Sequence, residues 1–79
     1  MIWHKADEDL PKLFLGDRVL VIVKEMGVNA VIVLEYYGSG TWYSFDEMYK
    51  GYEPADGEYW ALEQDVIASA ISSPEAPNV

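Results

Sequence analysis

The chain has 79 residues, of which 51% are hydrophobic, and its 14 acidic and five basic residues give a net charge of −9. This length accommodates one hydrophobic core, and the apolar content is high enough for the chain to fold. The negative charge argues against direct binding to nucleic acid or to an anionic membrane, because both present phosphates of the same sign. The absence of cysteine excludes disulfides and thiolate metal sites.

The first residues, 1–11, lack the basic start and apolar run of a signal peptide. The longest uninterrupted apolar runs have five residues, far short of the roughly 18 that a membrane-spanning helix needs. We therefore expect a cytoplasmic protein.

Two β-branched runs, residues 18–25 and 30–36, are the clearest strand predictions. Gly27 and Asn29 between them suit a short hairpin connection. Residues 38–40 form a second turn, residues 41–45 read as a third strand, and a short fourth strand is expected at 58–61. This order predicts an antiparallel meander of three to four strands.

The apolar runs at 19–23 and 30–34 do not alternate with polar residues, which is typical of strands buried on both faces. Residues 62–72 place Leu62, Val66, Ile67, Ala70 and Ile71 at helical spacing, so a C-terminal helix is expected to cover the second face. A second copy of the chain is the alternative cover. The predicted fold is thus α+β, a small antiparallel sheet with one C-terminal helix packed on a face. We expect a single domain over residues 1–73 and a flexible tail at 74–79.

The residues that could carry chemistry do not form a convincing site. A zinc site needs three or four ligands from histidine, cysteine and carboxylates, and this chain has one histidine, His4. The acidic run at 7–9 lacks the glycine and downstream glutamate of a calcium loop. The serines have only His4 as a base, and none stands in a nucleophile elbow. We therefore predict no catalytic residue, no metal, no cofactor and no enzymatic activity.

Residues 36–60 hold nine of the eleven aromatic residues, together with five carboxylates and one lysine. Tyrosines among flexible polar residues are typical of binding surfaces, where acidic neighbours steer a basic partner. The alternative is that these tyrosines pack beneath their loop. The predicted protein-binding residues are Trp42, Tyr43, Asp46, Glu47, Tyr49, Tyr52, Glu53, Asp56 and Glu58.

A series of short motifs runs through most of residues 3–62: Trp3, Asp9-Leu10-Pro11, Val19-Leu20-Val21, Tyr37 with Trp42, and Tyr59-Trp60 with Leu62. In this series the chain resembles the small phage and prophage proteins grouped as domain of unknown function 551. Residues 60–63 depart from the proline-rich close of that family. The resemblance implies a phage or mobile-element setting, in which small acidic proteins often bind and block a host protein, including defence nucleases with basic grooves. It transfers no catalytic residue.

These observations predict a non-catalytic, acidic, phage-type protein that binds a basic surface of a host protein and inhibits a nucleic-acid-handling or defence complex. The alternative is an unspecialised structural or accessory module, or a homodimeric protein, whose acidic surface reflects solubility.

Overall fold

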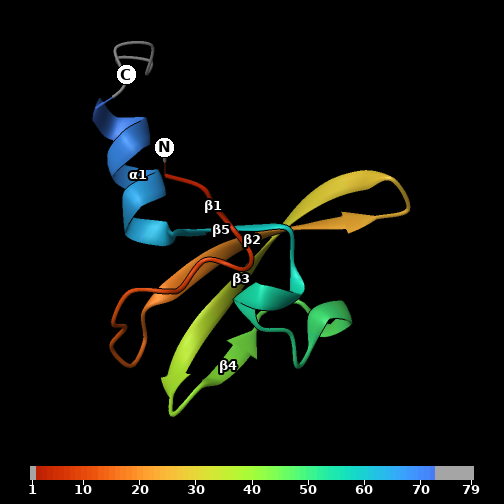
Figure 1. Ribbon diagram of the computed structural model, residues 1–79, viewed down its shortest axis with the longest axis horizontal. Coiled ribbons are helices and arrows are strands. Elements are labelled where there is room, and N and C mark those ends of the chain that lie inside the picture. Colours follow the sequence, from red (N-terminus) through yellow and green to blue (C-terminus); the bar gives the residue numbers. More distant parts are fainter. Residues whose placement is uncertain (1, 73–79) are drawn as a thin grey trace.

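The computed structural model describes residues 2–72 and shows a five-stranded antiparallel sheet with one C-terminal helix (Figure 1). The α+β class is as predicted, and the sheet has more strands than the expected three to four. The strands follow the order β1-β5-β2-β3-β4. In chain order the elements are β1 (His4–Lys5), β2 (Arg18–Glu25), β3 (Val28–Gly38), β4 (Thr41–Ser44), the 3₁₀ turns η1 (Glu47–Tyr49) and η2 (Pro54–Asp56), β5 (Tyr59–Leu62) and the helix α1 (Glu63–Ser72).

The β2–β3 hairpin turns at Met26 and Gly27, whose φ angles are 50° and 81°. Two successive positive φ angles match the right-handed twist of the strands they join. Asn29, expected in this turn, instead belongs to β3 and pairs with Lys24. The predicted turn at 38–40 joins β3 to β4, and a bulge between Tyr36 and Gly38 precedes it.

The sheet is not a simple meander, because β5 pairs with the free side of β2 instead of with β4. Trp60 and Ala61 point to opposite faces of β5 and are both buried. A strand that is buried on both faces is more stable between two other strands than at the edge of a sheet. The inner position of β5 requires a further edge strand, which β1 supplies with only two residues. A strand so short has no sequence pattern, and this accounts for the strand missing from the prediction.

The hydrophobic core lies on one face of the sheet. Its strand residues alternate, as the two-residue period requires, and the chain segments before β2 and between β4 and β5 cover them through the partly buried Leu10, Leu13 and Tyr52. His4 stacks on Trp60 with ring centroids 4.4 Å apart. The buried hydrophobic residues are Val19, Val21, Val23, Ile32, Leu34, Tyr49, Trp60 and Ala61.

The helix α1 does not cover the whole second face of the sheet, which we call the open face, as the prediction had it. The helix contacts β2 and β5 and then extends beyond the sheet (Figure 1). Ile67 is 51% exposed and Ile71 is 76% exposed. The physical reason is that no residue separates β5 from α1, so the chain has no turn with which to fold back over the sheet.

By register, the open face carries Leu20, Ile22, Val31, Val33 and Tyr43. Val31 is 57% exposed, whereas Leu20, Ile22 and Val33 are partly buried. The apolar runs are therefore fully buried on one side only. None of the helices in the described part of the chain has the length and apolar character needed to cross a membrane. The predicted tail at 74–79 lies outside the described residues.

Candidate protein-binding surface

An exposed group of three aromatic rings lies at the β4 edge of the open face. Tyr37 stacks on Tyr43 with centroids 5.7 Å apart, and Tyr43 meets Phe45 edge-on at 5.1 Å. The exposed fractions are 53% for Tyr37, 46% for Tyr43 and 53% for Phe45. We call these three residues the aromatic cluster. Such rings provide a large apolar contact area with little conformational freedom to lose on binding.

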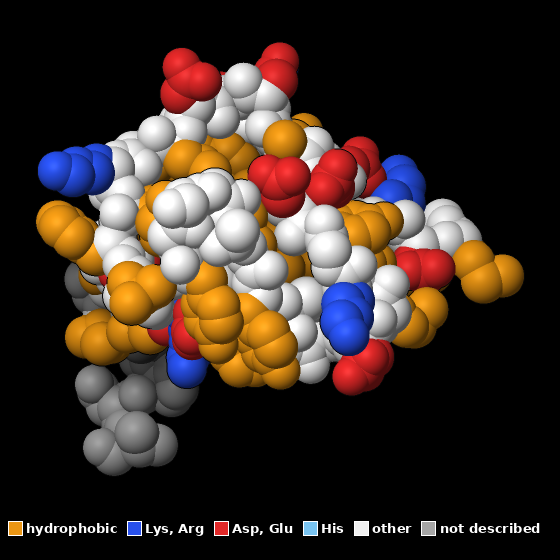
Figure 2. Space-filling view, turned by 90° about the horizontal axis from the view of Figure 1, so that it is seen from below, with side chains coloured by type: hydrophobic (Ala, Val, Ile, Leu, Met, Phe, Trp, Pro, Cys, Tyr) orange, Lys and Arg blue, Asp and Glu red, His pale blue; other side chains and the backbone are white. Residues whose placement is uncertain are grey.

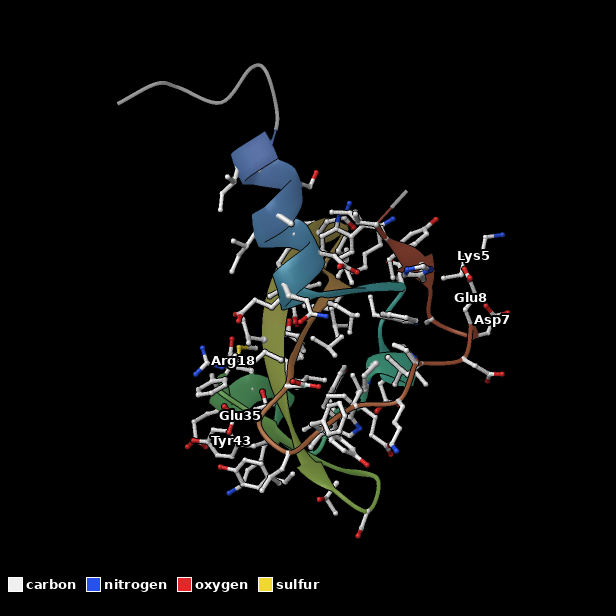
Figure 3. All side chains as sticks on the ribbon, turned by 90° about the vertical axis from the view of Figure 1, so that its left-hand side faces the viewer. Lys5, Asp7, Glu8, Arg18, Glu35 and Tyr43 are labelled. Carbon is white, nitrogen blue, oxygen red and sulfur yellow. The ribbon has the colours of Figure 1, made fainter. Side chains whose placement is uncertain are left out.

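Arg18 fixes one side of the aromatic cluster. Its guanidinium lies 5.2 Å from the ring centroid of Phe45, and its side chain also forms ion pairs with Glu35 at 3.3 Å and Glu63 at 3.9 Å. Figure 3 shows Arg18, Glu35 and Tyr43 together on one side of the sheet, with Lys5, Asp7 and Glu8 on the opposite side of the view. These two ion pairs offset the positive charge of Arg18.

Strand alternation turns Trp42 away from the aromatic cluster. Trp42 is partly buried on the core side and lies against Tyr36 with centroids 5.1 Å apart. A hollow of about 320 Å³ at the β4 edge is lined by Trp42, Tyr43, Glu47 and Lys50, together with Ser44 and Gly51. The edge therefore brings three of the predicted site residues into one concave place.

Asp46 and Glu47 lie next to this hollow and differ in role. The Asp46 carboxylate accepts the backbone N–H of Met48 at 3.0 Å and so caps η1, a local structural task. Glu47 is exposed and forms no ion pair within residues 2–72. Glu47 is thus the carboxylate most available to a partner at this edge.

Tyr49 and Tyr52, expected as binding residues, are packing residues in the structure. Tyr49 is only 7% exposed and meets Tyr52 edge-on at 5.1 Å. The Tyr49 hydroxyl donates a hydrogen bond to the Glu25 carboxylate. This bond, assisted by burial and by the negative charge of Glu25, raises the pKa of Tyr49 to about 12. Tyr49 therefore belongs to the core, and Tyr52 is partly buried against it.

The remaining predicted acids lie elsewhere. Glu53 precedes η2 as its N-cap and Asp56 is the last residue of η2. This turn contacts β2 and β5, whereas β4 is at the far edge of the sheet. The Asp56 carboxylate accepts the Glu53 N–H at 2.8 Å. Glu58 is exposed, and its backbone N–H donates to the Ile22 carbonyl at 2.8 Å. These three acids add to the overall field without bordering the aromatic cluster.

The surface divides by side-chain type. Figure 2 views the molecule from the β4 end, with apolar side chains gathered in the lower left and most acidic ones in the upper and right-hand parts. Among the described residues, the only ion pairs between a carboxylate and a lysine or arginine are the two at Arg18. Most carboxylates are therefore left to act on approaching charges.

The prediction missed Tyr37, Phe45 and Arg18. The alternation that separates Trp42 from Tyr43 also puts Phe45 on the side of Tyr43, so a signal for Phe45 was present. Alternation along β3 likewise puts Tyr37 on the side of Glu35, so a signal for Tyr37 was present as well. The contribution of Arg18 depends on its pairing with β3 and does not follow from local pattern.

Nowhere in residues 2–72 do three or more His, Cys, Asp or Glu side chains gather in a way that could hold a metal ion. Comparison with protein-family models, curated proteins and solved structures gave no match to this chain. The resemblance to the domain of unknown function 551 therefore stays a prediction.

Proposed function

We propose that this chain is a non-catalytic binding protein that docks on a basic surface of another protein through the β4 edge. The observation that carries the proposal is the exposed aromatic cluster beside the hollow that contains Glu47. Tyrosine anchors next to a pocket, bordered by charge, are the usual composition of the energetically important centre of an interface.

The charge distribution supports a basic partner. A body with a net charge of −9 attracts a basic surface over about one Debye length, near 8 Å at physiological salt. Glu47 and Asp46 lie beside the aromatic cluster, so the same attraction brings the partner to the anchors. Acids would set the rate of association, and the aromatic rings would hold the complex once it has formed.

The proposed biological setting comes from the sequence resemblance and is that of a phage or prophage. In this setting the basic partner would be a host protein, and occupation of its surface would inhibit a nucleic-acid-handling or defence complex. The acidic surface suits this role because grooves that bind nucleic acid are basic.

Immobilised protein exposed to host lysate, with elution by rising salt and mass spectrometry, tests the proposal. The informative variant is Tyr43→Ala, and its matched control is Tyr59→Ala, since Tyr59 is 43% exposed and lies in β5. We expect one basic protein to be retained by the native chain and by Tyr59→Ala, and Tyr43→Ala to bind it at least about 30-fold more weakly.

A charge pair of variants tests the steering role. Glu47→Lys should slow association with that protein, whereas Glu58→Lys, an equal change of net charge away from the aromatic cluster, should slow it less. Retention of the same partner by Tyr43→Ala with undiminished affinity, or an acidic partner, would contradict the proposed surface.

A further inference from the structure

Within the described part of the chain, about half of β3 lacks a neighbouring strand on the side that faces away from β2. β3 extends from Val28 to Gly38, but β4 pairs with it only from Leu34 onward. Among the residues that the structure describes, 28–33 therefore have β2 on one side and no strand on the other. This segment, which we call the free edge, is part of the hairpin that projects from the rest of the molecule (Figure 1).

The backbone groups of the free edge point outward at alternate residues. The Phe45 N–H donates to the Val33 carbonyl on the outer side at 3.4 Å, whereas the Tyr36 N–H donates to the Asp17 carbonyl on the β2 side at 2.7 Å. The backbone N–H and C=O groups of the odd-numbered residues of β3, including Asn29 and Val31, therefore point away from β2. Within residues 2–72, neither residue forms a hydrogen bond outside the sheet ladder.

The free edge also lacks the features that block strand pairing. Natural edge strands carry lysine, proline or a bulge, or are very short. β1 has two residues and includes Lys5, and β4 has four residues beside a bulge. Residues 28–33, with the sequence VNAVIV, contain no charge, no proline and no bulge. Val28 is 66% exposed and Val31 is 57% exposed.

We infer that the free edge pairs with the free edge of a second copy, antiparallel about a two-fold axis near Ala30, to join two sheets into one. In this register Asn29 lies opposite the partner's Val31, and Val31 lies opposite the partner's Asn29. Antiparallel pairing is self-complementary, because each copy presents the N–H and C=O groups that the other needs. Val28 and Val31 gain cover from the partner strand.

The net negative charge of the chain favours association through the free edge over association through its acidic surfaces. Two bodies of net charge −9 repel each other, and the free edge is a stretch of surface without an ionisable side chain. The projecting hairpin (Figure 1) holds the two bodies toward opposite ends of the joint sheet, so their acidic loops stay apart. A symmetric pair closes, because each copy uses its free edge once.

The test compares Val31→Pro with Val31→Thr by light scattering and sedimentation over a range of concentrations. Proline removes the outward N–H, which the fold does not use; threonine keeps it and keeps the strand preference. We expect the native protein and Val31→Thr to dimerise and Val31→Pro to do so at least about tenfold more weakly, since the two-fold axis removes the donor twice.

A third variant separates edge pairing from association through the open face. Leu20→Lys places a charge on the open face in β2, opposite Val33 at the end of the free edge that is remote from the axis at Ala30, so it should leave the dimer intact. A native protein that is monomeric at its highest soluble concentration overturns the inference. So does a dimer that tolerates Val31→Pro and is lost in Leu20→Lys, or an assembly that grows without limit.

Amide hydrogen exchange of the native protein provides a measurement that does not depend on the folding of the proline variant. Pairing protects the Asn29 and Val31 amides, so their exchange should slow as protein concentration rises. The backbone amide of Met48 in η1 is the control, and its exchange rate should not depend on protein concentration. Concentration-independent exchange at Asn29 and Val31 would overturn the inference.

Discussion

Replacing Gly57 by alanine should destabilise the fold through crowding alone. Gly57 has φ −94° and ψ −163°, which any residue can adopt, so the change adds no backbone strain. A Cβ atom at this position would overlap Cγ1 of Val21 and lie 2.9 Å from the Ile22 carbonyl oxygen. Neither neighbour can yield: Val21 is fully buried, and the Ile22 carbonyl accepts the Glu58 N–H at 2.8 Å.

Overpacking of this kind destabilises a domain by about 1–3 kcal/mol. For a domain of this size each kcal/mol lowers the melting temperature by roughly 4–8 °C, so we expect Gly57→Ala to melt on the order of 10 °C below the native protein. Thermal and urea unfolding followed by circular dichroism measure the change.

A double-mutant cycle with Val21→Ala checks the cause. Removal of Cγ1 opens space for the new methyl group, so the two losses should be less than additive by about 0.5–3 kcal/mol. Strict additivity of Gly57→Ala and Val21→Ala, or a melting temperature equal to that of the native protein, would refute the crowding argument.

A chain ending at Leu62 should still unfold cooperatively, with a loss of only about 1–3 kcal/mol, since Ile67 and Ile71 are exposed; aggregation or a non-cooperative melt would show that α1 protects the sheet. Leu34→Ala, fully buried, should lose about 2–5 kcal/mol, and Val31→Ala on the open face less than half as much; equal losses in urea titrations would contradict the assignment of faces. Stability should fall as pH rises from about 10, the pKa of tyrosine in the unfolded chain, to about 12, that of Tyr49 in the fold, because the folded state keeps a proton that the unfolded state releases. Tyr49→Phe should remove this dependence, and urea midpoints that change equally with pH in both proteins would contradict it.

Local chemistry is enough to place most elements of this protein in the sequence. The β-branched runs predict β2 and β3, and Gly27 and the glycines at 38 and 40 predict the turns. The apolar spacing predicts a helix over residues 62–72, which the structure shows as Glu63–Ser72. These features depend on the conformational preferences of neighbouring residues. The same alternation also separates Trp42 from Tyr43 across the sheet.

The candidate site was only partly predictable for the same reason. Sequence composition marked residues 36–60 as a binding segment, and Tyr43 and Glu47 do lie at an exposed edge. It could not tell those residues from Tyr49, which enters the core and bonds to Glu25 from a distant hairpin. A tyrosine is an anchor or a core residue according to what lies above it, and that is a long-range property.

Tertiary structure alone decided which side of the sheet is covered. The two-residue period of a strand puts Val19, Val21 and Val23 on one face and Leu20 and Ile22 on the other. Both sets are apolar, so the sequence does not indicate which of the two faces is covered. Gly57 passes close to β2, and this lets the chain return so that β5 lies between β1 and β2. The segment between β4 and β5 then covers the face that carries Val19, Val21 and Val23. The helix follows β5 without a turn and therefore runs past the sheet, because a chain cannot reverse direction without residues in which to do so.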